Sequence, residues 1–128
     1  MKRPTTIHCK GITLQPSKKG SVASCCLFSN FMDYLAYLSL SKDGKIALPK
    51  ECDCIILNHH FNLSHFLVES EEYEEVNLFL PNSSAGKVLT RTIMDRNPAA
   101  VDWSGSYIHF QSLRSYAYYK FIKNKESL

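Results

Sequence analysis

The sequence lacks both a long hydrophobic run and a secretory leader. Although 45% of its 128 residues are hydrophobic, no stretch approaches the roughly eighteen apolar residues that a transmembrane helix needs. The N-terminus is charged at Lys2 and Arg3, but His8, Cys9 and Lys10 stand where a signal peptide would have its apolar segment. We therefore expect no membrane span and a cytoplasmic location.

The chain also lacks a strong excess of charge of either sign. Its 15 Lys and Arg residues face 12 Asp and Glu residues, which gives a formal net charge of +3. Non-specific nucleic-acid binding relies on a more concentrated positive field than this. Nucleic-acid binding stays an alternative if the following basic residues converge on one face: Lys18, Lys19, Arg114, Lys120, Lys123 and Lys125.

Motifs of the common enzyme classes are missing as well. The sequence has no Gly-rich phosphate-binding loop and no dinucleotide-binding fingerprint. Ser104 lacks the preceding glycine that a nucleophile elbow requires, because Asp102 occupies that position. The acidic run from Glu69 to Glu75 is typical of a solvated loop rather than of paired catalytic carboxylates. We therefore expect no cofactor and favour a non-catalytic function.

The five cysteines form an odd set that suits a disulfide framework poorly, so we interpret them as reduced thiols. An enzyme that depends on cysteine or zinc stays an alternative, with Cys25 or Cys26 as a nucleophile near a helix N-terminus. The densest group of candidate metal ligands comprises Cys52, Cys54, His59, His60 and His65. Their spacing differs from the usual zinc patterns, and the simpler interpretation places Cys54 in the core.

The dipeptide Asp43-Gly44 gives the clearest local signal. Apolar and polar residues alternate on both sides of it, and an Asp-Gly pair suits a two-residue turn, so residues 38–48 are predicted to form a β-hairpin. A second hairpin is predicted from Val76–Leu80 and Lys87–Ile93, joined by a longer loop. Other strand-like segments are bounded by similar turn signals: 7–9, 12–14, 54–57 and 65–68.

Two segments are predicted to be helical. Asn30 is a candidate N-cap with Asp33 three residues later, and a short helix from there would place Phe31, Leu35 and Leu38 on one face. The stretch 110–125 has an apolar face and basic residues near its end; that face comprises Phe110, Leu113, Ala117 and Phe121. Together, these patterns predict a mostly β (α+β) fold in one domain over residues 1–128. We expect a small antiparallel β-barrel or sandwich with a short helix near residue 30 and a C-terminal helix.

Two local resemblances lie in the predicted hairpin. The segment from Ser41 to Glu51 resembles the start of the swapped-hairpin transition-state regulators, which bind DNA. The segment from Ser39 to Gly44 is similar to half of the signature of PilZ barrels, which bind a cyclic dinucleotide. The PilZ resemblance implies a degenerate nucleotide site, because the region before the predicted barrel has no pair of arginines three residues apart. We interpret the chain as an unrelated β-rich domain, with a nucleotide- or nucleic-acid-binding regulator as the alternative.

Aromatic residues make up 12% of the chain and gather with basic residues near its C-terminus. Such a mixture is typical of recognition surfaces, and the candidate partner-binding residues are Trp103, Arg114, Tyr116, Tyr118, Tyr119 and Lys120. We expect a small binding or regulatory module that acts through protein–protein contacts. A homodimer is also predicted, either through the edge of a strand at Val76–Leu80 or through the Tyr-rich terminal segment.

Overall fold

The fold is an open α/β sheet with helices on both faces. The structure is a computed structural model that describes residues 11–18, 22–44 and 47–126. The strands are β1 (Thr13–Gln15), β2 (Ser24–Phe28), β3 (Asp53–Ile56), β4 (Glu75–Phe79) and β5 (Ala100–Asp102). The helices are α1 (Phe31–Asp43), α2 (Leu63–Ser70), α3 (Ser84–Arg96) and α4 (Leu113–Glu126), with 3₁₀ turns η1 (His60–Asn62) and η2 (Ser104–Tyr107).

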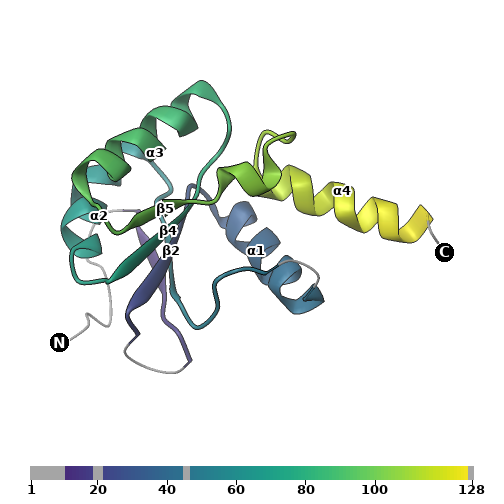
Figure 1. Ribbon diagram of the computed structural model, residues 1–128, viewed down its shortest axis with the longest axis horizontal. Helices are drawn as coiled ribbons and strands as arrows, with labels where there is room; N and C mark the ends of the chain where they lie inside the picture. Colours follow the sequence, from purple (N-terminus) through teal and green to yellow (C-terminus); the bar gives the residue numbers. More distant parts are fainter. Residues whose placement is uncertain (1–10, 19–21, 45–46, 127–128) are drawn as a thin grey trace.

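The strands form one five-stranded mixed sheet in the order β1-β3-β2-β4-β5. Strands β3, β2, β4 and β5 run parallel, whereas β1 is antiparallel to β3. Helices α1 and α4 lie on one side of the sheet and α2 and α3 on the other (Figure 1). The predicted antiparallel barrel or sandwich is therefore wrong, because parallel neighbours need crossover connections, and here helices supply them.

The central strands are buried on both faces. Cys25–Phe28 and Val76–Phe79 are continuous buried runs, and Leu27 pairs with Ile55 on one side and with Leu78 on the other. Strands covered by helices on both faces carry unbroken apolar runs instead of alternating ones. Strand β4 lies between β2 and β5, so the prediction that Val76–Leu80 is an open edge available for dimer pairing is wrong.

The alternating side chains of the sheet divide the core into two layers. Cys26 and Phe28 point into the layer beneath α1 and α4, where the Phe28 ring stacks on Phe79 at 5.4 Å between centroids. Cys25 and Leu27 point into the opposite layer, beneath α2 and α3. Adjacent residues of one strand thus face different core layers, so the thiols of Cys25 and Cys26 lie on opposite faces of the sheet.

The hairpin predicted at Asp43-Gly44 is a helix end. The Asn30 side chain accepts a hydrogen bond from the backbone N–H of Asp33, and α1 continues for 13 residues to Gly44. Gly44 has φ 74° and donates its N–H to the Leu40 carbonyl. A type I′ turn and a left-handed helix cap both need positive φ, which explains why this dipeptide fits either element. Residues 45–46 lie outside the described residues, and 47–48 are not in a strand.

The helix predicted near residue 30 is present, but it is longer than expected and buries another face. Asp33, Ala36, Tyr37 and Leu40 point into the protein, whereas the predicted face is exposed; its members are Phe31, Leu35 and Leu38. Apolar residues occur on both sides of α1, so periodicity alone does not identify the side that faces the sheet.

The second predicted hairpin is half correct. Its first strand exists as β4, but Lys87–Ile93 lies within α3, which begins where the Ser83 hydroxyl accepts a hydrogen bond from the Gly86 N–H. The strand predicted at 65–68 is part of α2. Packing of Phe66 and Ile93 against the sheet outweighs the β propensity of the branched residues in these segments. The strand-like segment predicted at 7–9 lies outside the described residues.

The C-terminal helix is confirmed as α4. It packs on α1, and its far end projects beyond the rest of the molecule (Figure 1). Within the described segments, every helix is too short or too polar to cross a membrane.

Candidate functional site

The carboxyl ends of β2 and β4 form the topological switch point of the sheet. The chain leaves β2 toward α1 on one face and leaves β4 toward α3 on the other (Figure 1). Open α/β sheets bind their ligands in the crevice between two such strands. In this protein the segment from Ser104 to Gln111 is bonded to the residues that follow β4. The usual site is therefore occupied by the chain itself.

Asn82 fixes this segment in place. Its side-chain amide donates to the carbonyl oxygens of Tyr107 at 3.0 Å and Phe110 at 2.9 Å. Its backbone N–H donates to the Gln111 carbonyl at 2.7 Å. The buried Tyr107 hydroxyl in turn donates to the Leu80 carbonyl at 2.8 Å. These bonds hold the connection to α4 rigidly against the end of β4.

Asp33 ties α1 to the first turn of α4. Its carboxylate is buried and accepts a hydrogen bond from the Arg114 backbone N–H at 3.0 Å, while its own backbone N–H donates to the Asn30 cap. Burial raises the pKa of this carboxyl above its ordinary value, while the bond from Arg114 opposes that rise. A carboxylate at a helix N-terminus also interacts favourably with the helix dipole. The mutual position of α1 and α4 is therefore specified by a polar contact as well as by packing.

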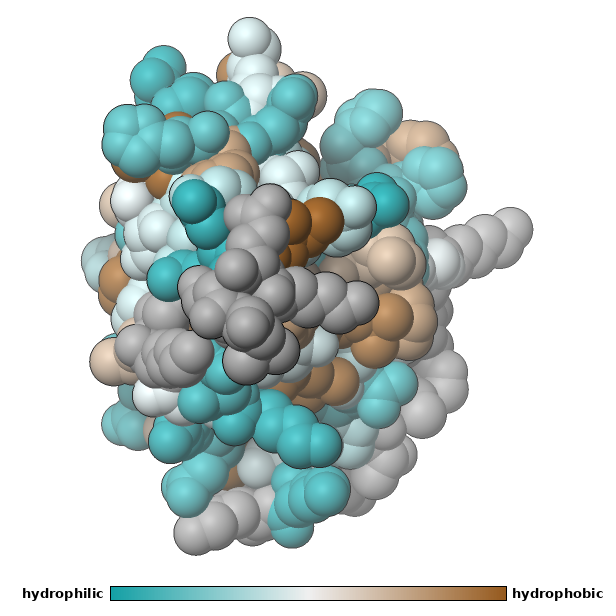
Figure 2. Space-filling view, turned by 90° about the vertical axis from the view of Figure 1, so that its right-hand side faces the viewer, coloured by the Kyte–Doolittle hydropathy of each residue, from teal (hydrophilic) through white to brown (hydrophobic). Residues whose placement is uncertain are grey.

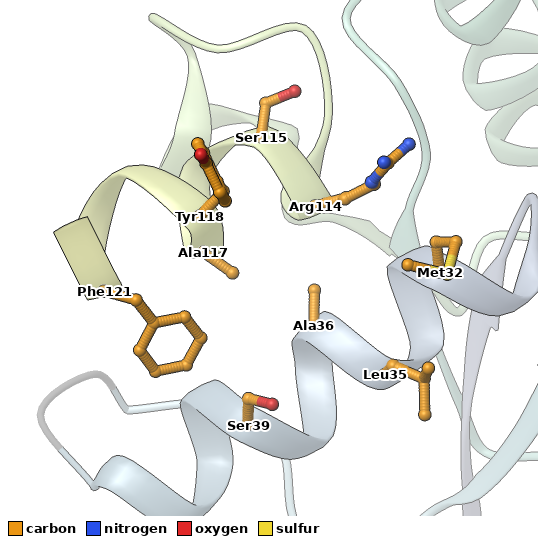
Figure 3. Close-up of a pocket in the computed structure, with 9 residues that line it drawn as sticks. All are labelled: Met32, Leu35, Ala36, Ser39, Arg114, Ser115, Ala117, Tyr118 and Phe121. Atoms are coloured by element: carbon orange, nitrogen blue, oxygen red, sulfur yellow. The ribbon is translucent and has the colours of Figure 1, made fainter.

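A groove of about 480 Å³ opens between α1 and α4. Its α1 wall is formed by Met32, Leu35, Ala36 and Ser39, and its α4 wall by Arg114, Ser115, Ala117, Tyr118 and Phe121. Figure 3 shows Ala36 and Ala117 facing one another, with the Phe121 ring at the end nearest Ser39. The two small alanines let the groove run between the helices without a large side chain filling it. We call this feature the α1/α4 groove.

Several apolar side chains of the α1/α4 groove are exposed. Met32, Leu35, Phe121 and Tyr118 all reach solvent, and Tyr118 is 68% exposed. Figure 2 views this side of the molecule, where hydrophobic atoms are exposed among hydrophilic ones. Contiguous exposed apolar surface with a polar border marks an interaction site. The α1/α4 groove is therefore the candidate functional site.

Two of the six predicted partner-binding residues line this groove, namely Arg114 and Tyr118. Trp103 has a structural position instead: its indole N–H donates to the buried Asn77 side chain at 2.8 Å, and its ring stacks on Phe79 at 5.5 Å. The Trp103 side chain thus seals the core beside β4.

The other three predicted residues lie elsewhere on α4. Tyr116 and Tyr119 pack against Phe110 at 5.4 Å and 5.1 Å. The ammonium group of Lys120 lies 5.7 Å from the centre of the Tyr116 ring. These contacts brace α4 against the segment before it, which leaves Tyr118 as the most exposed of the terminal aromatic residues.

The candidate metal ligands are not brought together. Cys52 and Cys54 lie in the core layer beneath α1, whereas His59 and His60 are exposed beyond the other end of β3. His65 is exposed on α2, which packs on the opposite face. In the described parts of the chain, no three His, Cys, Asp or Glu side chains are placed to hold a metal ion.

The structure brings three thiols together instead. Cys26 pairs in register with Cys54 on the neighbouring strand, and Cys52 lies in the same core layer. Sequence reasoning placed Cys26 and Cys54 in separate hypotheses, because only strand pairing reveals that they are neighbours. Met32 was missed as a site residue, and Leu35 was predicted only as a member of the apolar face of the helix near residue 30.

The predicted basic surface is divided. Lys18 lines a cavity on one side of α1, whereas Arg114 lines the α1/α4 groove on the other side. Lys19 lies outside the described residues.

The chain was compared with protein-family models, with curated proteins and with solved structures, and none of the three comparisons gave a match.

Proposed function

We propose that this protein is a non-catalytic binding module that holds an amphipathic, acidic helical segment of a partner protein in the α1/α4 groove. The observation that carries the proposal is the open apolar channel between two helices whose relative position is fixed by Asp33. Helix-in-groove recognition uses such a surface, with apolar anchors at spacings of three and four residues on the partner.

The length of the groove suits a short helix. A second hollow shares Ser39 and Phe121 with it and continues to Lys42 and Asp43. From Met32 to Asp43 the wall of α1 extends about 16 Å, at 1.5 Å per residue. A partner helix of about three turns would cover this distance and bury the exposed side chains of Met32 and Leu35.

The charges around the groove favour an acidic partner. Arg114 stands at one end and Lys42 beside Asp43 at the other, with Lys123 exposed further along α4, so cations outnumber the one carboxylate. A second copy of this chain would bring the same cations against one another, which disfavours self-association through this face. An acidic segment meets them with opposite charge, so we commit to that occupant.

The proposal is tested by selecting a displayed library of amphipathic helical peptides against the full chain. We expect enriched peptides to combine apolar residues spaced by three and four with Glu or Asp at their ends. Their affinity should fall by at least about tenfold on Leu35→Glu or Phe121→Glu, the loss expected when a central contact is removed. Fluorescence anisotropy with one enriched peptide measures this change.

The matched control is Val88→Glu, which places the same charge on an exposed valine of α3, 62% accessible and on the opposite face of the sheet. This variant should keep the affinity of the unmodified protein. Arg114→Glu should reverse the preference from acidic to basic peptides. Enrichment of no peptide, of peptides without acidic residues, or of peptides sensitive to Val88→Glu would contradict the proposal. Salt-sensitive binding of single-stranded DNA that Phe121→Glu abolishes would also contradict it, in favour of a nucleic-acid site.

A further inference from the structure

A second open cavity lies on the side of α1 that is turned away from the α1/α4 groove. It measures about 580 Å³, within the range of about 300–1,000 Å³ that is usual for small-molecule sites. Its walls are α1, the loop after β1 and the segment that leads into β3. Each wall contributes one lysine, namely Lys42, Lys18 and Lys50 in that order. We call this feature the lysine cavity.

Hydrogen bonds hold the walls of the lysine cavity in place. The Tyr37 hydroxyl on α1 donates to the Pro49 carbonyl, which ties α1 to the segment before β3. The Asp53 carboxylate accepts the Ser17 N–H at 2.8 Å, which ties the loop after β1 to β3. Since these bonds already fix the walls in the free protein, a ligand that enters does not have to order them.

The charges of the lysine cavity favour an anion with more than one negative charge. Its three lysines are exposed, and the described lining residues include one carboxylate, that of Glu51. A phosphate monoester carries a charge of about −1.5 to −2 at pH 7 and presents three acceptor oxygens. It therefore matches three separate ammonium groups better than a ligand carboxylate does, which has a single charge and two oxygens.

The Ser41 hydroxyl is a polar group of the same wall that such a ligand would satisfy. Ser41 lines the lysine cavity, and its oxygen is buried without a hydrogen-bond partner among the described residues. A buried hydroxyl without a partner is destabilising. Ser41 stands next to Lys42, so a phosphate oxygen held by the Lys42 ammonium group would lie near this hydroxyl.

The α1 wall of the lysine cavity changes from aromatic to cationic along its length. Tyr34, Leu38 and Lys42 follow one another at intervals of four residues, so they form one row on the helix. Leu38 is 43% exposed although it is apolar. From Tyr34 to Lys42 the row extends about 12 Å, at 1.5 Å per residue. A ligand that covers it needs a flat apolar ring, a spacer and an anionic end.

We propose that the lysine cavity binds a nucleoside monophosphate, with its base against Tyr34 and Leu38 and its phosphate among the three lysines. Every base has a flat π face that stacks on an aromatic side chain, and the ribose supplies the spacer. Lysine binds phosphate as a point charge and needs no glycine-rich loop. The lysine cavity lies apart from the α1/α4 groove, so this proposal does not depend on the partner helix proposed there.

The proposal is tested by isothermal titration calorimetry of the full chain with adenosine monophosphate at low ionic strength. Adenosine and ribose phosphate should each bind at least about tenfold more weakly, because each lacks one of the two recognised parts. The combined substitution Lys42→Gln and Lys50→Gln should weaken the binding of adenosine monophosphate by at least about tenfold. It should also reduce the loss of affinity that added salt causes.

Ser41→Ala separates an effect on binding from an effect on folding. It removes a hydroxyl that has no partner among the described residues, so the free energy of unfolding measured in urea should not fall. The affinity for adenosine monophosphate should nevertheless fall by about two- to tenfold, the loss expected for one hydrogen bond.

The matched control is the combined substitution Lys87→Gln and Arg91→Gln, which removes two cations from exposed positions of α3 on the opposite face of the sheet. This variant should keep the affinity of the unmodified protein. Any of the following results would overturn the proposal: no binding of adenosine monophosphate, an equal affinity for adenosine, or an equal affinity for ribose phosphate. An equal loss of affinity in the α3 control would overturn it as well.

Discussion

At the scale of single residues, Asn82 is the side chain on which the closed switch point depends. Its amide group donates to backbone carbonyl oxygens of the segment before α4. Removing the donor takes one hydrogen bond from each of these partly buried carbonyl groups, although the Tyr107 carbonyl keeps its bond from the Phe110 N–H. We expect Asn82→Ala to lower the free energy of unfolding by about 1–3 kcal/mol, as measured by urea denaturation.

The isosteric substitution Asn82→Asp provides the stricter comparison. It keeps the shape of the side chain but presents an acceptor to the carbonyl groups of Tyr107 and Phe110. We expect it to destabilise the protein more than Asn82→Ala does at neutral pH. If the Asn82→Asp variant and the unmodified protein proved equally stable in parallel urea titrations, these hydrogen bonds would not be what holds the segment.

The buried carboxyl group of Asp33 should make the free energy of unfolding fall as pH rises. Burial raises the pKa of its carboxyl in the folded protein, so the folded state holds the proton more tightly than the unfolded chain does. Stability contributed by this group is therefore lost as pH rises from the ordinary carboxyl pKa through the raised one. We expect Asp33→Asn, measured against the unmodified protein in urea at a series of pH values, to gain relative stability across that interval.

The control for this measurement is Asp43→Asn, which makes the same change of charge at an exposed position of the same helix. This variant shows how the change in net charge alone alters the pH dependence of the free energy of unfolding. If Asp33→Asn and Asp43→Asn give the same pH profile, the buried carboxyl does not contribute the predicted dependence.

At the scale of elements, the end of α1 is set by the backbone of Gly44. Its φ of 74° is one that L residues adopt at a cost, and a Cβ there would meet no atom within 4 Å. Gly44→Ala therefore tests conformational strain without a steric clash. We expect a loss of about 1 kcal/mol in the free energy of unfolding, from thermal or urea unfolding.

Gly105→Ala is the matched substitution, since a Cβ at Gly105 also meets nothing within 4 Å, and its φ lies outside the left-handed region. This change should be neutral or slightly stabilising, because alanine reduces the freedom of the unfolded chain. A loss at Gly105 as large as that at Gly44 would contradict the role of positive φ.

At the scale of the whole molecule, the position of β4 decides how the protein associates. Phe79 is 1% exposed and lies inside the sheet, so Phe79→Lys buries a charge. We expect this variant to unfold, since the loss of a core Phe alone costs about 3–5 kcal/mol of a total stability of about 5–15 kcal/mol. Circular dichroism should show the loss of structure, whereas Tyr118→Ala should keep the native spectrum.

The unmodified protein should have a mass near 14.6 kDa by light scattering. The edges of the described sheet, β1 and β5, are short strands of three residues each, and short edge strands resist pairing with a second copy. A homodimer through the terminal aromatic segment, which the sequence suggested, is the competing prediction. A doubled mass that Tyr118→Ala or Phe121→Glu abolishes would establish it and would contradict an acidic partner in the α1/α4 groove.

The fold was only partly predictable because several of its local signals have two meanings. The side chain of Asn30 and the C-terminal helix were recognised from caps and periodicity, and both predictions hold in the structure. Gly44 was assigned the correct positive φ but the wrong element. The apolar run at 54–57 and the alternating segment at 76–80 were identified as strands. The unbroken apolar character of 54–57 was not used, although it distinguishes parallel strands covered on both faces from antiparallel ones.

The candidate sites depended still more on tertiary contacts. Arg114 and Tyr118 were predicted from composition, but Met32 and Leu35 became part of the same surface only when α4 packed beside α1.

The sequence by itself determined local features such as the Asn30 cap and the positive φ of Gly44, because caps and φ preferences act within a few residues. It predicted a strand over Val76–Leu80 and favoured a helix over 110–125, and the structure has these elements as Glu75–Phe79 and Leu113–Glu126. Only the tertiary structure decided which strands are neighbours, which side of α1 is buried, and that Cys26 lies beside Cys54. These outcomes depend on which arrangement buries the most apolar surface. That buried area comes from segments far apart in the chain, so no local pattern determines it.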